Sequence, residues 1–417
     1  MPAESAVAAA VAKAHRQQWA FVLAATARIT RDLDLAEECV QEAYAQALVQ
    51  WTDQGVPKRP EAWLTTVARR RALDTVRRHD TLRGKLPLLA GDDIAPPADL
   101  DFTDQDIPDD RLRLIFTCCH PSLDVDTRIG LTLRLVCGLS TAEVARALLV
   151  SEPTMAARIT RGKKKIKAAK IPYREPSPEE LPTRLDAVLD VVHLVFSTGY
   201  TAPSGDRLQR RDLVERALHL ARVLHQLLPG QSGAAGLLAL ILLTDARRLT
   251  RTRKDGSLAL LSEQDRTLWY AEEIQEGLRL VRSAARHRPP TRYALMAAIA
   301  AVHARAPSWE ATDWRGIVDL YDSMLEVWPS PVVALNRAIA IGQAYGPQAG
   351  LDALAELAAE PQLTGYQYFA AARADFLRRL HRVDEARAAY REALARTENS
   401  VEREFLRSRL EELGTLP

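Results

Sequence analysis

The basic residues of this chain gather in two segments where they could bind a polyanion. Residues 111–170 contain twelve Lys or Arg against four acidic residues, a local charge of +8, although the 417-residue chain has a formal net charge of only +2. A second group of five arginines lies between residues 69 and 78. Because a phosphate backbone is attracted by local rather than total charge, this distribution predicts contact with nucleic acid.

The most specific motif is Leu139–Ile166, which reads LSTAEVARALLVSEPTMAARITRGKKKI. Thr141 is expected to cap a first helix, Leu149–Val150 to turn the chain, and Ser151 to cap a second helix that accommodates Pro153 in its first turn. The pattern predicts a helix-turn-helix whose second helix enters a DNA major groove, with a lysine-rich end for phosphates. The alternative is an ordinary helical hairpin with a solvated basic face.

Two further helices are expected near the N-terminus. The first, Asp32–Trp51, has an apolar stripe and an acidic outward face, which is either a solvated surface or a docking surface. The loop Thr52–Arg59 and a helix that begins at Pro60 follow, with the five arginines on that helix. A basic helix beside an aromatic-bearing loop is typical of proteins that bind single-stranded or melting DNA, although a solvated arginine face is also compatible with it.

Other residues that could do chemistry do not form a site in the sequence. Cys118, Cys119 and His120 are adjacent, but a metal site needs three or four converging ligands and no fourth ligand lies at a suggestive spacing. The chain has no Gly-rich phosphate loop and no nucleophile elbow. We therefore expect no metal, no cofactor of the chain's own and no enzymatic activity.

Nearly every long segment has the three- and four-residue apolar spacing of a helix, so the expected fold is all-α. Four blocks are expected: residues 1–80, an acidic linker over 81–110, a compact block over 111–170 and a long block over 171–417. Eight Asp and no basic residue lie between residues 91 and 110. Few cysteines, no signal peptide and no long apolar run predict a reduced, cytoplasmic protein that does not enter a membrane.

The last block contains pairs of expected helices joined by short turns. Arg211–Leu228 pairs with Ala234–Arg248, and Gly365–Leu380 pairs with Val383–Ala395. The second pair fits the roughly 34-residue tetratricopeptide (TPR) pattern, so a TPR-like domain is expected and an irregular helical domain is the alternative. Such arrays bind partners or pack against other domains.

Together these motifs resemble the extracytoplasmic-function (ECF) group of bacterial sigma factors, in the sigma-70 family. The resemblance rests on the order AEECVQEAYAQA, PEAWLTTVARRRALDTVRR, linker and helix-turn-helix, and covers about residues 10–170. The segment KDGSLALLSEQDRTLWYAEEIQEG also looks like part of an ECF subgroup with a TPR-like C-terminal extension. The first block is then region 2 and residues 111–170 are region 4.

The resemblance implies two partners, core RNA polymerase (its β′ clamp helices and β flap) and promoter DNA. The residues implied in polymerase binding are Asp34, Glu37, Glu38, Gln41 and Glu42. Those implied at the −10 element, beside a base-trapping loop Thr52–Arg59, are Trp63, Thr66, Arg69, Arg70, Arg71, Arg77 and Arg78. Those implied at the −35 element are Ser151, Ala156, Ala157, Arg158, Thr160, Arg161, Lys163, Lys164 and Lys165.

Two positions depart from the family pattern. Arg70 stands where the family commonly has Asn, and Ala156 and Ala157 stand where polar side chains are common, which leaves Arg158 and Arg161 as the stronger candidates for base contacts. The resemblance implies a sigma factor whose C-terminal domain packs on the sigma regions, or binds a protein partner, and regulates activity in cis with either sign. The alternatives are a helix-turn-helix regulator with a TPR sensor domain and a TPR scaffold.

Overall fold

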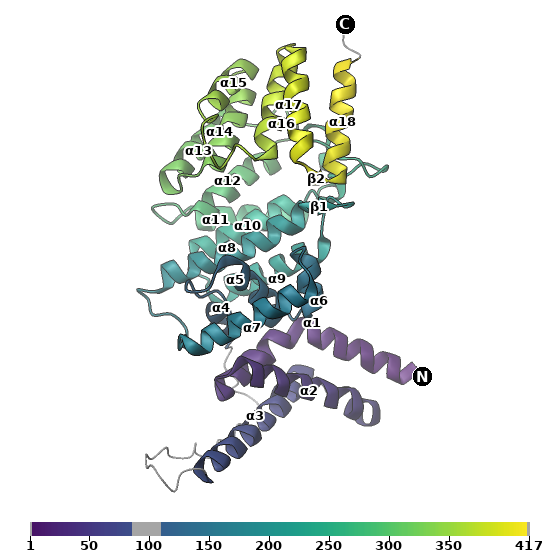
Figure 1. Cartoon of the computed structure of the whole chain (residues 1–417), viewed down its shortest axis with the longest axis vertical. Coiled ribbons are helices and arrows are strands. Elements are labelled where there is room, and N and C mark those ends of the chain that lie inside the picture. Colours follow the sequence, from purple (N-terminus) through teal and green to yellow (C-terminus); the bar gives the residue numbers. More distant parts are fainter. Residues whose placement is uncertain (1, 86–109, 415–417) are drawn as a thin grey trace. The chain divides into compact units, whose positions relative to one another are not determined.

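The computed structural model describes residues 2–85 and 110–414 and divides the chain into two compact units, Met1–Val191 and Val192–Pro417 (Figure 1). The all-α prediction is confirmed, because the only strands among the described residues are two of two residues each. No helix in this described part is long and apolar enough to cross a membrane. Most of the acidic linker, residues 86–109, lies outside the described residues.

The first unit begins with three helices that pack against one another, which we call the amino-terminal bundle: α1 (Pro2–Thr30), α2 (Leu33–Gln54) and α3 (Pro60–Lys85). Asp32 starts α2, because its carboxylate accepts hydrogen bonds from the backbone N–H groups of Asp34 and Leu35 at 3.0 and 3.2 Å. Gly55 ends the helix with a φ of +81°, a value that favours glycine.

The helix-turn-helix block follows in the same unit. Leu149 makes the turn with a φ of +55°, and Ser151 caps the second helix, as the sequence predicts. The expected cap at Thr141 is wrong by one residue. Ser140 is the cap, because its side chain and that of Glu143 form a reciprocal capping box that satisfies two backbone N–H groups. The block consists of α4 (Arg111–Cys118), α5 (Val125–Leu131), a π-helical turn (Thr132–Val136), α6 (Thr141–Ala147) and α7 (Glu152–Ala168).

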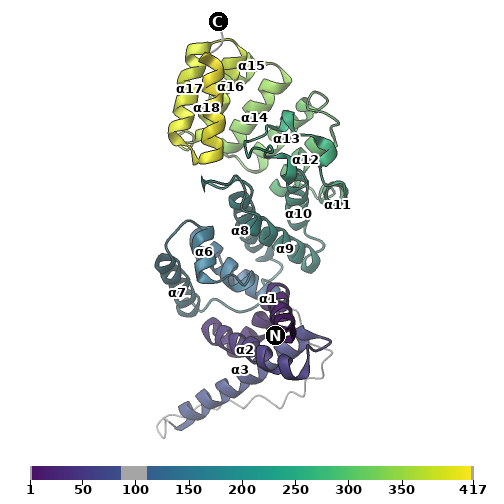
Figure 2. The same cartoon turned by 90° about the vertical axis from the view of Figure 1, so that its right-hand side faces the viewer.

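The division between the units falls within α8 (Leu181–Tyr200), after the Pro-rich segment where the long block was expected to open. The second unit continues as helical hairpins with short turns, and Figure 2 shows α16, α17 and α18 lying side by side. Both expected helix pairs are present, as α9 with α10 and as α16 with α17. The helices are α9 (Arg211–Leu227), α10 (Ser232–Asp245), α11 (Ala271–Ala284), α12 (Arg292–Arg305), α13 (Trp314–Val327), α14 (Pro331–Ala344), α15 (Pro347–Ala355), α16 (Gln367–Arg379), α17 (Val383–Arg396) and α18 (Ser400–Gly414).

The two ends of the second unit are joined by hydrogen bonds. Strand β1 (Ser204–Gly205) pairs in parallel with β2 (Glu398–Asn399). The side-chain amide of Asn399, fully buried, donates to the carbonyls of Ala202 and Arg207 at 3.0 and 2.9 Å. A buried amide needs such partners, so these bonds hold the last hairpin against the loop that follows α8.

Gly236 allows the backbones of α10 and α12 to approach closely. A Cβ at this position would lie 2.6 Å from the backbone nitrogen of Ala294, whereas a Cβ at Gly230 would meet nothing within 4 Å. We expect Gly236→Ala to lower the free energy of unfolding by about 1–3 kcal/mol, because the helices must separate. Urea unfolding followed by circular dichroism measures this, with Gly230→Ala as the control, and equal midpoints for the two variants would contradict it.

Candidate DNA and protein interfaces

Helix α7 presents one polar face because its other face is packed. Met155, Ile159 and Ile166 are buried, and Gly162 lies so close to α5 that a Cβ would come within 2.6 Å of the Thr127 methyl group. The expected DNA-facing residues divide into exposed and contacting ones. Those with exposed side chains are Ser151, Ala156, Ala157, Thr160, Arg161, Lys164 and Lys165.

The other two expected −35 residues form ion pairs within the unit. Arg158 is half-buried and lies 3.2 Å from a carboxylate oxygen of Asp126 on α5. Lys163, with only 11% of its side chain exposed, donates hydrogen bonds to Asp34 at 2.7 Å and to Glu37 at 2.5 Å, both on α2. In this arrangement the expected DNA-contacting lysine is therefore engaged by the expected polymerase-binding helix.

Glu37 does not face outward as the sequence analysis expected, and that expectation is wrong. It is only 6% exposed, and Arg134 of the π-helical turn forms an ion pair with it beside Lys163. A buried carboxylate requires such partners, because leaving water unpaired is costly. Burial lowers the pKa of Lys163, but the charges and hydrogen bonds of Glu37 and Asp34 outweigh that effect and raise the pKa above its ordinary value.

Further contacts join the amino-terminal bundle to the helix-turn-helix block and the segment after it. The buried indole N–H of Trp19 donates to the carbonyl of Leu135 at 3.0 Å. Lys167 binds the capping carboxylate of Asp32 at 2.8 Å, and the Tyr173 hydroxyl donates to the carbonyl of Ala24 at 2.9 Å. Burial raises the pKa of Asp32, but these hydrogen bonds and the Lys167 charge lower it below the usual range. The packing is therefore both apolar and ionic.

The rest of the acidic face of α2 is accessible. Glu38, Gln41 and Glu42 have exposed side chains, and Glu42 forms a 2.7 Å ion pair with Arg71 of α3, a residue that is itself exposed. Exposed pairs of this kind add little stability, so Glu42 can exchange partners at small cost.

Helix α3 exposes most of the expected −10 residues. Arg70, Arg71, Arg77 and Arg78 are exposed, Thr66 is half-buried, and nearly all of the loop Thr52–Arg59 is exposed. Trp63 is half-buried and packs edge-on against Trp51 with ring centroids 5.5 Å apart. Arg69 is only 7% exposed, so the expectation that it faces outward is wrong. Burial lowers its pKa, as does nearby Arg28, whereas Asp110 raises it.

The cysteines do not form a reactive or metal-binding group. All four are free and buried, and burial raises the pKa of Cys119 to about 11, so its thiol stays protonated at neutral pH. Within residues 2–85 and 110–414, no group of three or more His, Cys, Asp or Glu is placed to hold a metal ion.

Sequence reasoning missed Trp19 and Arg134 as contact residues between the two parts of this unit. Trp19 lies in an alanine-rich helix and Arg134 in an apolar run, and neither belongs to a motif with a known spacing. Their only sequence signal is a large or charged side chain on an apolar stretch. That signal shows that a partner is needed but does not identify it.

The Lys163 ion pairs predict a stability difference between neighbouring lysines of α7. Lys163→Met leaves the buried Glu37 with Arg134 alone, so we expect the free energy of unfolding to fall by about 1–3 kcal/mol. Lys164→Met, at an exposed position on the same helix, is expected to stay within about 0.5 kcal/mol of the parent. Urea unfolding of both variants checks this, and equal losses would show that the buried pair contributes nothing specific.

Comparisons with known proteins agree with this geometry. Residues 16–81 match the family model of sigma-70 region 2, residues 113–166 match that of sigma-70 region 4, and residues 184–285 match a family of unknown function (DUF6596). An uncharacterized protein of Rhizobium meliloti (strain 1021) is 40% identical over 404 residues, which are 95% of this chain and 94% of that protein.

Two relatives carry a functional name. The ECF RNA polymerase sigma factor SigK of Mycobacterium sp. (strain KMS) is 30% identical over 139 residues, which are 32% of this chain and 69% of that protein. SigK of Mycobacterium ulcerans (strain Agy99) is 30% identical over 134 residues, 32% of this chain and 71% of that protein. The chain therefore belongs to the ECF group of the sigma-70 family, with regions 2 and 4 in its first unit and a helical extension behind them.

Proposed function

We propose that this sigma factor binds core RNA polymerase through α2 and directs it to promoters that α3 and α7 recognise. The observation that carries the proposal is the combination, in one compact unit, of an exposed acidic patch on α2 with a helix-turn-helix whose second helix is exposed on one face. A helix-turn-helix regulator that acts on duplex DNA alone has no use for the acidic patch.

The acidic patch, defined as Glu38, Gln41 and Glu42, is the proposed contact for the β′ clamp helices of the polymerase. Its members lie on successive turns of one helix face and are exposed. Charged groups at the edge of an interface mainly steer association and set its register. Region 4 is proposed to contact the β flap.

The loop Thr52–Arg59 and the exposed arginines of α3 are the proposed −10 contacts. Flipping a base out of the duplex costs a few kcal/mol, which is recovered only when the base fits its site. Arginines along one helix supply the phosphate contacts that position the melted strand. Arg70 is exposed where the family commonly has Asn, and it is proposed to contribute charge rather than a base-specific amide contact.

On α7, exposed Arg161 is the first candidate for base readout at the −35 element, and Arg158 is the second because it must leave Asp126. A bidentate arginine–guanine pair provides about 1–3 kcal/mol of discrimination. Lys163 cannot bind phosphate while it is hydrogen-bonded to Asp34 and Glu37. Contact of Lys163 with DNA therefore competes with its ion pairs to α2.

Charge reversal tests polymerase docking. We expect Glu38→Lys with Glu42→Lys to weaken binding to core polymerase about tenfold at low salt, because the complementary field is inverted. The control carries the same charge change at two exposed sites in the second unit, Asp384→Lys and Glu411→Lys. Binding is measured by pull-down and by run-off transcription with purified core enzyme.

Unchanged binding by a folded Glu38/Glu42 double variant would reject α2 as the docking helix. Specific binding of duplex promoter fragments without any run-off product would instead favour the helix-turn-helix regulator. The two outcomes are distinguished in the same preparation, because fragment binding and transcription are read separately.

The second unit is proposed to regulate the sigma regions in cis. A covalently attached domain has a high effective concentration, so a weak contact with either region can be well populated. The family resemblance of the extension favours a required, positive role. The uncharacterized relative matches along almost its whole length, which indicates that this arrangement of domains is shared between the two proteins.

A chain that ends at Val191, the boundary of the first unit, tests regulation in cis. We expect run-off transcription to fall several-fold and to recover only partly when residues 192–417 are added as a separate chain, because the effective concentration is lost. Circular dichroism establishes that the shortened chain is folded. Equal activity from an equally stable shortened chain would exclude control in cis.

A further inference from the structure

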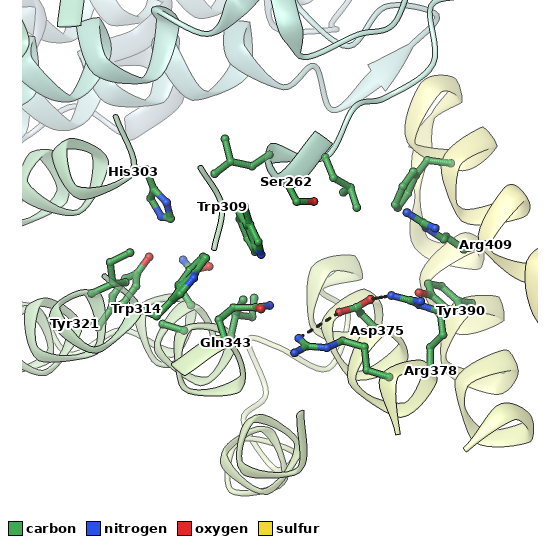
Figure 3. Close-up of a pocket in the computed structure, with 18 residues that line it drawn as sticks. Ser262, His303, Trp309, Trp314, Tyr321, Gln343, Asp375, Arg378, Tyr390 and Arg409 are labelled. Atoms are coloured by element: carbon green, nitrogen blue, oxygen red, sulfur yellow. Dashed lines mark hydrogen bonds and ion pairs between the residues drawn. The ribbon is translucent and has the colours of Figure 1, made fainter. Parts of the chain in front are cut away.

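The second unit contains a cavity of about 620 Å³ on the inner side of its helical hairpins (Figure 3). Side chains from α12, α13, α14, α16, α17 and α18 line it, together with Leu260, Leu261 and Ser262 of the loop between α10 and α11. Cavities of this size hold small organic molecules and bury most of their surface. Neither region 2 nor region 4 contributes to it.

One end of the cavity is aromatic. Figure 3 shows His303, Trp309, Trp314 and Tyr321 gathered there. The rings of Trp309 and Trp314 meet edge to face with centroids 4.6 Å apart, and His303 meets Trp314 in the same way at 5.2 Å. These contacts fix the rings before anything binds, so an apolar or planar group would enter a preorganised site.

The other end is basic. Arg378, Arg379 and Arg409 line it against a single carboxylate, Asp375. Asp375 lies 2.7 Å from Arg378 and 3.9 Å from Arg379, while Arg409 reaches Glu412 at 2.8 Å and Glu263 at 3.6 Å. Each guanidinium carries five N–H donors, so one carboxylate and these longer contacts leave donor capacity for an anion.

Two buried nitrogen atoms of the lining residues have no hydrogen-bond partner, Nε of Arg378 and Nδ1 of His303. Burial lowers the pKa of His303 to about 4, so the ring is neutral and its nitrogens can act as one donor and one acceptor. Buried polar atoms are normally satisfied, and a ligand with a polar end is one way to satisfy them.

The segment KDGSLALLSEQDRTLWYAEEIQEG, which the sequence analysis singled out, supplies the loop over this cavity. The loop is folded back by a bridge between Thr252 and Leu258, and Glu263 holds it to Arg253 at 2.6 Å and near Arg409. A second cavity of about 410 Å³ shares Leu261 and His303 with the first. The conspicuous sequence therefore has a structural role as one wall of both cavities.

We propose that this cavity binds a small organic carboxylate, with the carboxylate at the arginine end and an aromatic or aliphatic body against Trp309 and Trp314. Three arginines against one acid select an anion, and the aromatic end selects its apolar body. The proposal goes beyond the sigma-factor function and does not rest on polymerase or promoter binding.

Isothermal titration calorimetry of the full chain tests it with 3-phenylpropionate and decanoate, and with the corresponding neutral amides. We expect one saturable site with a Kd of about 0.1–1 mM for the carboxylates, at least tenfold weaker binding of the amides, and a rise in Tm with the carboxylates. Absence of saturable binding by both carboxylates, or equal binding of acids and amides, would overturn the proposal.

Matched variants locate the site. Arg379→Gln removes a guanidinium from the cavity and is expected to weaken carboxylate binding about tenfold. Arg396→Gln removes one that is paired with Glu392 on α17 and does not line the cavity, so binding should be unchanged. Gln343→Trp fills the cavity from α14 without altering its charge, and is expected to abolish binding. Equal effects of Arg379→Gln and Arg396→Gln, or full binding by Gln343→Trp, would place the ligand elsewhere and reject the cavity.

Discussion

The buried carboxylate of Glu37 is the interaction on which the first unit depends. It lies on α2 but its partners, Arg134 and Lys163, come from the helix-turn-helix block, nearly a hundred residues or more along the chain. A carboxylate out of water is stable only when charged hydrogen-bond donors surround it. The packing of these two blocks is therefore specified by charge as well as by the apolar contact of Trp19, and removing one partner exposes the others to an unfavourable environment.

The same constraint affects how the sigma regions can be used. Lys163 and Asp34 belong to surfaces expected to meet DNA and polymerase, yet here they bind each other. The neighbouring residues Glu38, Gln41, Arg161 and Lys164 remain exposed. The unit thus divides each expected surface into a part that is accessible and a part that is internally paired, and the paired part can contact another molecule only after these ion pairs break.

The second unit is organised differently, by the joining of its ends. The amide of Asn399 and the short β1–β2 pairing hold the last hairpin to the loop after α8. Hairpin arrays often have open ends, because each repeat contacts only its neighbours. Here the ends are tied, and the inner face carries a cavity with an aromatic end and a basic end. That separation of chemistry along one cavity fits an amphipathic ligand better than an extended peptide.

The sequence by itself determined the all-helical fold, the helix-turn-helix and the family, because these depend on local spacing. Leu149 in the turn and Ser151 at the cap act within a few residues of their own position, and the helix pairs of the second unit follow from periodicity and short turns. The burial of Glu37 and Arg69 and the contact between Asp34 and Lys163 were decided only by the tertiary structure. Helical periodicity says which residues share a face, but an acidic or basic residue next to the apolar stripe is exposed or buried according to what packs there. For Glu37 that partner lies 97 residues away at Arg134, and no local pattern contains it. The cavity has the same origin, because its arginines and tryptophans come from different hairpins and meet only when the hairpins stack.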